Sequence, residues 1–312
     1  MKTDNETKQQ VLSFDEFMDV FRDKLLDAHE KQPVTFEIKE ELIMKSSSEL
    51  HGIIVRSSGK SVAPVFYYED FYRSYINGVS IDSSVKQIFD YMLKNDLPGE
   101  DFGDKISRWK EAKDHLIIKL INAQRNRKLL KDVPHRRIGD MAAIVQIHIE
   151  SEEIGAGTVI VDDMLLSIWD ISTEKLFEQA FKNMNKFELD ISDLRSFAPP
   201  NKELPVDGPN IYVLRYKAEI FGAPAILNTK KIMEFAEKKE TDLFVMPVSI
   251  HEALLIEYRD DISREFLYGM LSSINSDHAV QDNVLSYEVF LLKRGNSELT
   301  YVSDGSVLSM CG

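Results

Sequence analysis

Along most of this chain, apolar residues recur at the spacing of either an α-helix or a β-strand, and the two spacings predict the elements of the fold. The first apolar face begins after Ser13, which together with Glu16 has the residue types of a helix capping box. In the N-terminal third the pattern predicts helices over residues 14–26, 67–77 and 82–93, and strands over residues 34–38, 51–55 and 62–67.

The most regular pattern runs from Trp109 to Ile149. Between Trp109 and Ile121, apolar residues fall three and four positions apart, which predicts a long amphipathic core helix that ends before Pro134. Val145 and Ile147 then alternate with polar residues, as in a half-buried strand.

Beyond residue 138 the predicted elements alternate more regularly. Strands are expected over residues 141–149, 157–161, 164–169, 211–216, 223–227, 243–246, 285–293 and 299–302, and helices over residues 173–184, 229–239 and 262–274. The strands come in hairpins, which favours an α+β fold of mainly antiparallel sheets with helices packed on one side, and repeated strand-strand-helix units in the C-terminal half.

Two domains are expected from the length and from this change of pattern. Residues 1–130 would form an N-terminal α+β domain that ends in the long amphipathic helix. Residues 131–312 would form a C-terminal α+β domain of strand-strand-helix units.

Several segments together carry a resemblance to a known family. They are Pro64-Val65-Phe66-Tyr67, Phe71-Tyr72, Trp109, Lys119-Leu120-Ile121-Asn122, Pro134-His135, Asp140, Trp169 and Pro247 to Leu255. From about residue 34 onward the chain resembles an uncharacterised family of Firmicutes proteins that is carried as a domain of unknown function. The resemblance implies a bacterial, intracellular α+β protein, and it supplies no activity and no functional residues.

Charge and cysteine content narrow the classes of function. The chain has 52 acidic and 38 basic residues and a net charge of −14, which argues against general affinity for nucleic acid or anionic membranes. Cys311 is the single cysteine, so neither an internal disulfide nor a thiolate metal cluster is expected. No signal peptide or membrane span is apparent, and we expect a cytoplasmic protein without a membrane partner.

No complete catalytic motif or phosphate-binding glycine loop is found, and no cofactor is expected. His251 beside Ser249 or Glu252 is a candidate base, although a histidine with such neighbours is more often structural. The better catalytic candidates are strand-end carboxylates with a nearby histidine that together offer ligands for Mg²⁺ or Mn²⁺. These residues are Asp140, His148, Asp162 and Asp163. The alternative for adjacent acids after a strand is an ordinary turn.

Aromatic residues are concentrated between Tyr67 and Tyr75. They offer a stacking platform for RNA bases, but their helical spacing favours core packing.

A basic segment, residues 125–137, departs most from the acidic background, with six Arg or Lys residues against Asp132 alone. Its candidate anion- or partner-binding residues are Arg125, Arg127, Lys128, Lys131, His135, Arg136 and Arg137. The structural alternative is a solvated helix end whose cations complement the helix dipole.

The sequence therefore favours a non-enzymatic cytoplasmic binding or interaction protein that uses the basic segment. The partner would be a protein or a phosphate-bearing molecule, and nucleic acid is disfavoured by the net charge. A metal-dependent hydrolase or nuclease that uses the strand-end carboxylates is the alternative.

Overall fold

The computed structural model describes residues 11–45, 48–58, 60, 63–94, 100–151, 155–197, 208–218, 221–277 and 283–308. The chain divides into two compact units. Unit 1 comprises residues 1–45, 49–105 and 150–156, and unit 2 comprises residues 46–48, 106–149 and 157–312. The boundary expected between residues 130 and 131 falls inside unit 2.

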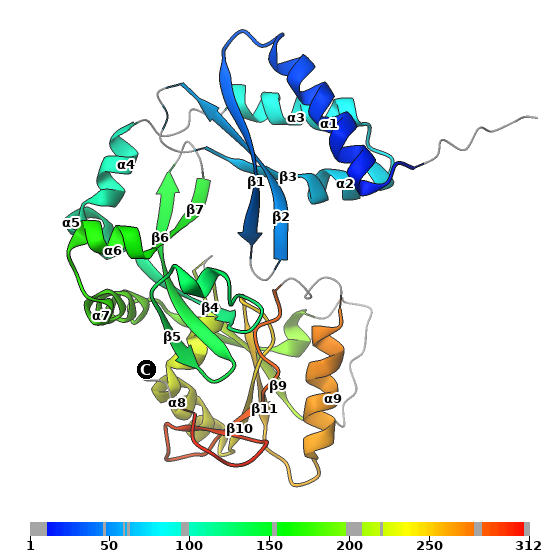
Figure 1. The fold of residues 1–312 in the computed structure, drawn as a ribbon. Helices are drawn as coiled ribbons and strands as arrows, with labels where there is room; N and C mark the ends of the chain where they lie inside the picture. Colours follow the sequence, from blue (N-terminus) through cyan, green and yellow to red (C-terminus); the bar gives the residue numbers. More distant parts are fainter. Residues whose placement is uncertain are drawn as a thin grey trace, which may run out of the picture. The chain divides into compact units, whose positions relative to one another are not determined.

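Unit 1 combines a three-stranded sheet, in the order β1-β2-β3, with helices α1, α2 and α3 (Figure 1). The strands are Phe36–Lys45, Ser48–Ser57 and Val65–Tyr67, and the helices are Phe14–His29, Tyr68–Ile76 and Ile81–Lys94. The capping box at Ser13 and Glu16 is present, as the sequence predicts. A further helix, α4, spans Glu100–Ser107.

The core of unit 1 is rich in aromatic rings. Phe17 and Phe21 from α1 are fully buried and pack with Tyr68 and with Ile53 of β2. The hydroxyl of Tyr72 donates to the Leu12 carbonyl at 2.9 Å, and Leu12 N donates to the Tyr75 hydroxyl at 3.2 Å. These contacts support core packing for the aromatic concentration rather than a stacking platform.

The smaller sheet of unit 2 follows α5 (Trp109–Ala112) and has the strand order β4-β6-β5, with β7 also paired to β6. Its strands are Leu116–Asn122, His135–Ile138, Met141–Ser151 and Gly155–Ile160 for β4, β5, β6 and β7. β4 and β5 both pair with β6 in antiparallel register.

The long amphipathic helix expected from Trp109 is wrong, because α5 ends at Ala112 and the chain continues through a short 3-10 helix, η1 (Lys113–His115), into β4. Six of the seven residues of β4 are buried, so both faces of the strand are covered. A strand that is buried on both faces has a nearly continuous apolar sequence, which imitates the spacing of a buried helix. The β-branched Ile117, Ile118 and Ile121 favour the strand.

The larger sheet of unit 2 has six strands in the order β13-β12-β10-β11-β9-β8, and each neighbouring pair is antiparallel. The strands are Leu189–Asp193, Ile211–Tyr216, Leu243–Pro247, Ala253–Glu257, Phe290–Leu292 and Leu299–Tyr301 for β8 to β13. The helices of unit 2 that follow the smaller sheet in the chain are Asp163–Trp169, Thr173–Met184, Thr229–Lys239 and Arg264–Asn275 for α6 to α9. Strand pairs followed by helices recur along the chain, and the α+β class is confirmed.

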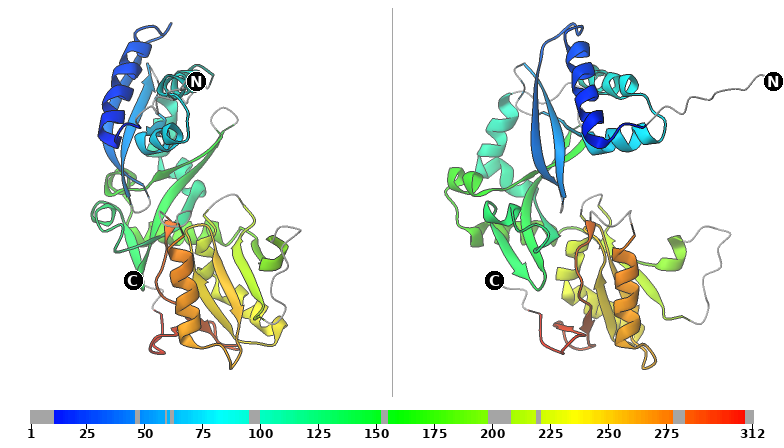
Figure 2. Two further views of the ribbon diagram at one scale, coloured as in Figure 1. Left: turned by 90° about the vertical axis from the view of Figure 1, so that its right-hand side faces the viewer. Right: turned by 45° about the vertical axis from the view of Figure 1, so that its right-hand side comes forward.

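Helices cover both faces of the six-stranded sheet, whereas the sequence predicts them on one side (Figure 2). Ile232 and Ala236 of α8 pack with Leu255 on one face, and Leu267 of α9 packs with Met246 on the other. All five residues of β10 are buried. Helices on both sides follow from this, because an apolar strand needs a cover on each face.

Two predicted strands are helical. Residues 164–169 lie in α6, where the Asp162 side chain caps the helix by accepting a hydrogen bond from Leu165 N at 2.8 Å. Residues 223–227 form a 3-10 helix, η4 (Ala223–Leu227), with Pro224 near its start, where a missing N–H is tolerated. The apolar run after His251 contains β11. No helix in the described part of the chain combines the length and apolar character that a membrane span requires.

Candidate functional site

The basic segment runs from the connection after β4 into β5. Asn122 is buried, and its side-chain oxygen accepts a hydrogen bond from Arg125 N at 3.0 Å. Asn126, also buried, donates to the Asn122 carbonyl at 2.8 Å. The chain then forms a 3-10 helix, η2 (Leu129–Lys131), whose Leu130 packs into a small core cluster. The expected helix end is absent, so its dipole does not account for these cations.

The register of β5 separates two of the candidate arginines. Arg136 is opposite Ala143 and Arg137 is opposite Ala142, so their side chains leave from opposite faces of the sheet. The Arg136 guanidinium lies 4.8 Å from the centre of the Phe177 ring on α7. Arg137 is exposed and donates to the Gly139 carbonyl at 3.4 Å. Arg136 therefore has a packing role and does not join the other cations.

The remaining cations lie around one end of the smaller sheet. Ala123 N donates to the Asp140 carbonyl at 2.9 Å, which places the start of the basic segment beside the β5–β6 turn. Arg127, Lys131 and Arg137 are exposed, and none of them forms an ion pair within 4.0 Å in the part of the chain that the structure describes. Lys128 is also exposed. His135 is half-buried, and its ring Nδ1 is 3.0 Å from the Val133 carbonyl.

Asp140 connects the β5–β6 turn to the segment that precedes β12. Its carboxylate accepts hydrogen bonds from the Ser286 hydroxyl at 2.7 Å and from Tyr287 N at 2.8 Å. Asn122 donates to the carbonyl of the neighbouring Leu285 at 3.2 Å. Burial raises the pKa of Asp140, and these hydrogen bonds only partly oppose the shift. Both carboxylate oxygens are thus committed to a structural connection.

The other catalytic candidates are separated from Asp140. Val161 N donates to the Val145 carbonyl at 3.0 Å, so Asp162 lies beside the middle of β6. That part of the strand is about four residues, or roughly 13 Å, from Asp140. Asp162 caps α6, Asp163 is the first residue of that helix, and His148 lies further along β6. Across the described residues, no three or more His, Cys, Asp or Glu side chains gather in a group that could hold a metal ion.

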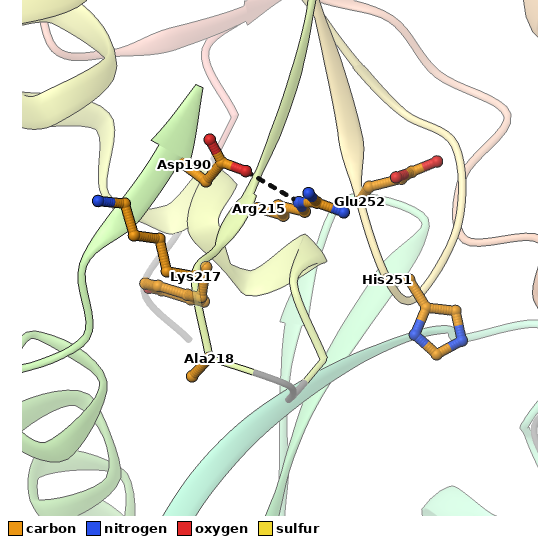
Figure 3. A pocket seen from close by; sticks show the side chains of 7 residues that line it. Asp190, Arg215, Lys217, Ala218, His251 and Glu252 are labelled. Carbon is orange, nitrogen blue, oxygen red and sulfur yellow. Dashed lines mark hydrogen bonds and ion pairs between the residues drawn. The ribbon is translucent and has the colours of Figure 1, made fainter. Parts of the chain in front are cut away.

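The structure contains a pocket of about 600 Å³ in unit 2, which we call the β9 pocket (Figure 3). It is lined by Asp190, Arg215, Tyr216, Lys217, Ala218, His251 and Glu252. Its volume is in the range of small-molecule sites. Asp190 comes from β8, the central lining residues come from the end of β9, and His251 and Glu252 come from the loop between β10 and β11.

Glycine at position 222 allows two walls of the β9 pocket to meet. A Cβ atom at Gly222 would overlap the His251 carbonyl oxygen and lie 2.7 Å from Cβ of Arg215. The close approach brings the His251 loop against β9. Ser249 secures the same loop, because its hydroxyl accepts a hydrogen bond from His251 N at 3.1 Å. That bond uses the backbone of His251, so Ser249 does not engage the ring in it.

Charges in the β9 pocket are partly paired. Arg215 Nε is 3.1 Å from the Asp190 carboxylate, which also accepts a hydrogen bond from the Ser192 hydroxyl. Lys217 pairs with Glu188. Burial lowers the pKa of His251, and the positive charge of Lys119 lowers it further, so the ring is neutral near pH 7. Burial raises the pKa of Tyr216 to about 12.

Sequence reasoning identifies His251 and Glu252 but misses Asp190, Arg215 and Lys217. Arg215 and Lys217 alternate with buried residues of β9, which is the ordinary pattern of a half-buried strand. Their relation to Asp190 depends on the pairing of Asp190 with Arg215 across β8 and β9. That register brings together residues 25 positions apart, and no local signal in the sequence specifies it.

Comparison with curated proteins and with solved structures found no significant match. Residues 14–294 match the model of a protein family described as a family of unknown function, DUF5688. The match covers most of the chain, including all of the strands that line the β9 pocket and the whole basic segment. The chain therefore belongs to the DUF5688 family.

Proposed function

We propose that this protein is a cytoplasmic binding protein whose basic segment takes an acidic or phosphorylated segment of a partner protein. The observation that carries the proposal is the set of exposed cations on an anchored connection. Arg127, Lys131 and Arg137 have no ion-pair partner within 4.0 Å among the described residues. Carboxylates and phosphates are the groups that arginine and lysine bind through charge-assisted hydrogen bonds.

The anchoring of the segment supports binding because it reduces the cost of ordering the cations. Asn122 and Asn126 hold the first turn through buried hydrogen bonds, and Leu130 fixes η2 to the sheet. Less conformational entropy is then lost when a partner docks than would be lost by a disordered basic tail.

A short acidic segment fits this surface better than nucleic acid. At physiological ionic strength the Debye length is about 8 Å, so a short ligand responds mainly to the local cations. A long polyanion extends beyond them and meets the remainder of a chain with a net charge of −14. The separation of Asp140 from Asp162 gives the hydrolase alternative no comparable support.

Fluorescence anisotropy with labelled peptides tests the proposal. The probes are a fifteen-residue Glu/Gly peptide, the same peptide with phosphoserine in place of glutamate, and a single-stranded oligonucleotide of equal charge. The test variant is R127E/K131E/R137E, which leaves Arg136 in place because Arg136 packs on Phe177. We expect wild-type protein to bind at least one peptide with an affinity that falls as the salt concentration rises. The variant should bind the same peptide at least tenfold more weakly.

The matched control is K182E/K230E/K238E, which changes the net charge equally at exposed positions of unit 2 outside the basic segment. Its binding should fall much less than that of the test variant. Equal losses in the two variants would mean that only net charge matters. If the oligonucleotide binds more tightly than both peptides, the partner is nucleic acid and the proposal of a protein partner is rejected. If the test variant binds as well as wild type, the basic segment is not the binding site.

A further inference from the structure

The proposed function of the basic segment does not explain the β9 pocket. The pocket is formed by β8, β9 and the β10–β11 loop, and it shares no residue with the basic segment. Its lining residues carry two cations, Arg215 and Lys217, and two anions, Asp190 and Glu252. A simple anion in the pocket would meet the repulsion of Glu252, and a simple cation would meet that of Arg215.

Arg215 is oriented to bind an anionic group. Its Nε is held by Asp190, which fixes the plane of the guanidinium. In the described part of the chain, no acceptor is hydrogen-bonded to its two terminal nitrogens, which remain available to a ligand. A guanidinium in this arrangement presents a fork that matches a carboxylate. Lys217 is different, because it pairs with Glu188 and extends the other way from Arg215 (Figure 3).

Glu252 supplies the opposite chemistry on the other side of Arg215 (Figure 3). Its side chain is half-buried, and no described side chain donates a hydrogen bond to its carboxylate or forms an ion pair with it within 4.0 Å. A partly desolvated carboxylate without a donor favours a ligand that provides one, and an ammonium group provides up to three.

The loop that carries Glu252 is held in place before any ligand binds. Ser249 N donates to the Glu252 carbonyl at 3.2 Å, and Ile250 N donates to the Asn283 carbonyl at 3.3 Å. Gly222 packs directly against the His251 carbonyl from the other side. The backbone that carries Glu252 is therefore fixed relative to β9 by the fold, which limits the separations that the guanidinium and the carboxylate can adopt.

We propose that the β9 pocket binds a small zwitterion of the amino-acid class, with its carboxylate on the Arg215 guanidinium and its ammonium group on Glu252. The neutral His251 ring stands at the same pocket as a donor or acceptor for the remainder of the ligand. A zwitterion uses the terminal nitrogens of Arg215 and the Glu252 carboxylate at once, whereas an inorganic anion or a simple amine uses one of these groups and is repelled by the other.

Isothermal titration calorimetry of the full chain tests this proposal. Each proteinogenic L-amino acid is titrated separately, followed by the N-acetyl derivative and the carboxamide of any amino acid that binds, and by acetate and inorganic phosphate. We expect at least one free amino acid to bind, and each blocked derivative to bind at least tenfold more weakly. If no free amino acid binds, or if acetate or phosphate binds as tightly, the assignment is overturned.

Two variants assign the contacts. E252Q should no longer distinguish the free amino acid from its N-acetyl derivative, and R215Q should no longer distinguish it from its carboxamide. K182Q is the matched control and should keep both preferences, because Lys182 is exposed and does not line the pocket. E252Q changes a loop side chain without a described partner, so it remains informative if R215Q unfolds. Unchanged discrimination in E252Q would reject the assignment of the ammonium site.

Discussion

At the scale of single residues, Asp140 binds partners that lie far from it in the sequence. Its carboxylate holds Ser286 and Tyr287, which follow it by 146 and 147 positions. The sequence pattern predicts that Asp140 belongs to a strand-end group of acids. The strand that begins near position 140 can be inferred from neighbouring residues, but a partner near position 286 cannot. The same limit applies to Arg215 and Asp190, which the strand register brings together.

Replacing Asp140 with alanine should destabilise unit 2 by about 1–3 kcal/mol, because two donors lose their acceptor in a partly buried site. Urea denaturation at pH 7, monitored by an observable that reports on unit 2, measures the change in the free energy of unfolding. Asp132→Ala is the control, since Asp132 is exposed, and its effect should stay within about 0.5 kcal/mol.

The raised pKa of Asp140 also gives a pH dependence with a definite sign. Burial favours the protonated form of Asp140 in the folded state. The stabilisation that comes from this pKa shift is therefore full below the unfolded-state pKa of about 3.9, and it is lost as pH rises through the folded-state pKa. The stability advantage of wild type over Asp140→Asn should therefore be larger at pH 3.5 than at pH 7. An advantage that grows with pH would contradict the shift.

Two glycines give a matched pair of substitutions. Gly222→Ala would force the new Cβ atom into the His251 carbonyl oxygen, and displacing that loop should cost about 1–3 kcal/mol. Gly269 lies inside α9, where a new methyl group would meet no atom of another element within 4 Å, and Gly269→Ala should stabilise by about 0.5–1 kcal/mol through helix propensity. Thermal denaturation of both variants checks the opposite signs.

At the scale of elements, local signals predict helices with caps well and buried strands poorly. Ser13 and Glu16 mark the start of α1 because a capping box is a contact within four residues. The pattern predicts a helix at β4 because the strand's cover, α7 on one face and η2 on the other, comes from elsewhere in the chain. The sequence of α6 resembles that of a strand because it contains Met164 and Ile168, although both side chains are exposed on the helix.

The capping box makes a prediction for α1. Ser13→Ala removes the acceptor of Glu16 N and a donor to the Glu16 carboxylate, and it should destabilise unit 1 by about 1 kcal/mol. Ser74→Ala, within α2, is the control: Ser74 bonds back to the Asp70 carbonyl inside the helix, so alanine should be neutral or slightly stabilising. Equal destabilisation in urea titrations of the two variants would rule out a specific role for the cap.

At the scale of the whole molecule, each unit has its own core. Among the residues that the structure describes, the members of the aromatic cluster of unit 1 lie between residues 12 and 92, and the members of the three apolar clusters of unit 2 lie from residue 106 onward. The sequence predicts a division between residues 130 and 131, whereas the compact units meet near residue 105 and again near residues 150–156. The helix expected from Trp109 contributes to the difference, because it assigns the chain before β4 to the N-terminal part.

Separate cores predict separate responses to core substitutions. Phe21→Ala should cost unit 1 about 3–5 kcal/mol, since Phe21 is fully buried among aromatic rings. Native-state hydrogen exchange should then show faster exchange for amides of α1 and β2, while amides of β10 and β11 keep their protection. Loss of protection in β10 and β11 by the same free energy would show that the two units unfold together.

The order of strands in the six-stranded sheet has a consequence for synthesis of the chain. β12 and β13 leave the ribosome after β10, and β12 covers one edge of β10, whose five residues are all buried in the folded protein. Until that hairpin arrives, or in a chain that is cut before residue 290, β10 presents an uncharged apolar edge to other nascent chains. Pairing of β12 with β10 therefore protects this edge of the sheet against aggregation.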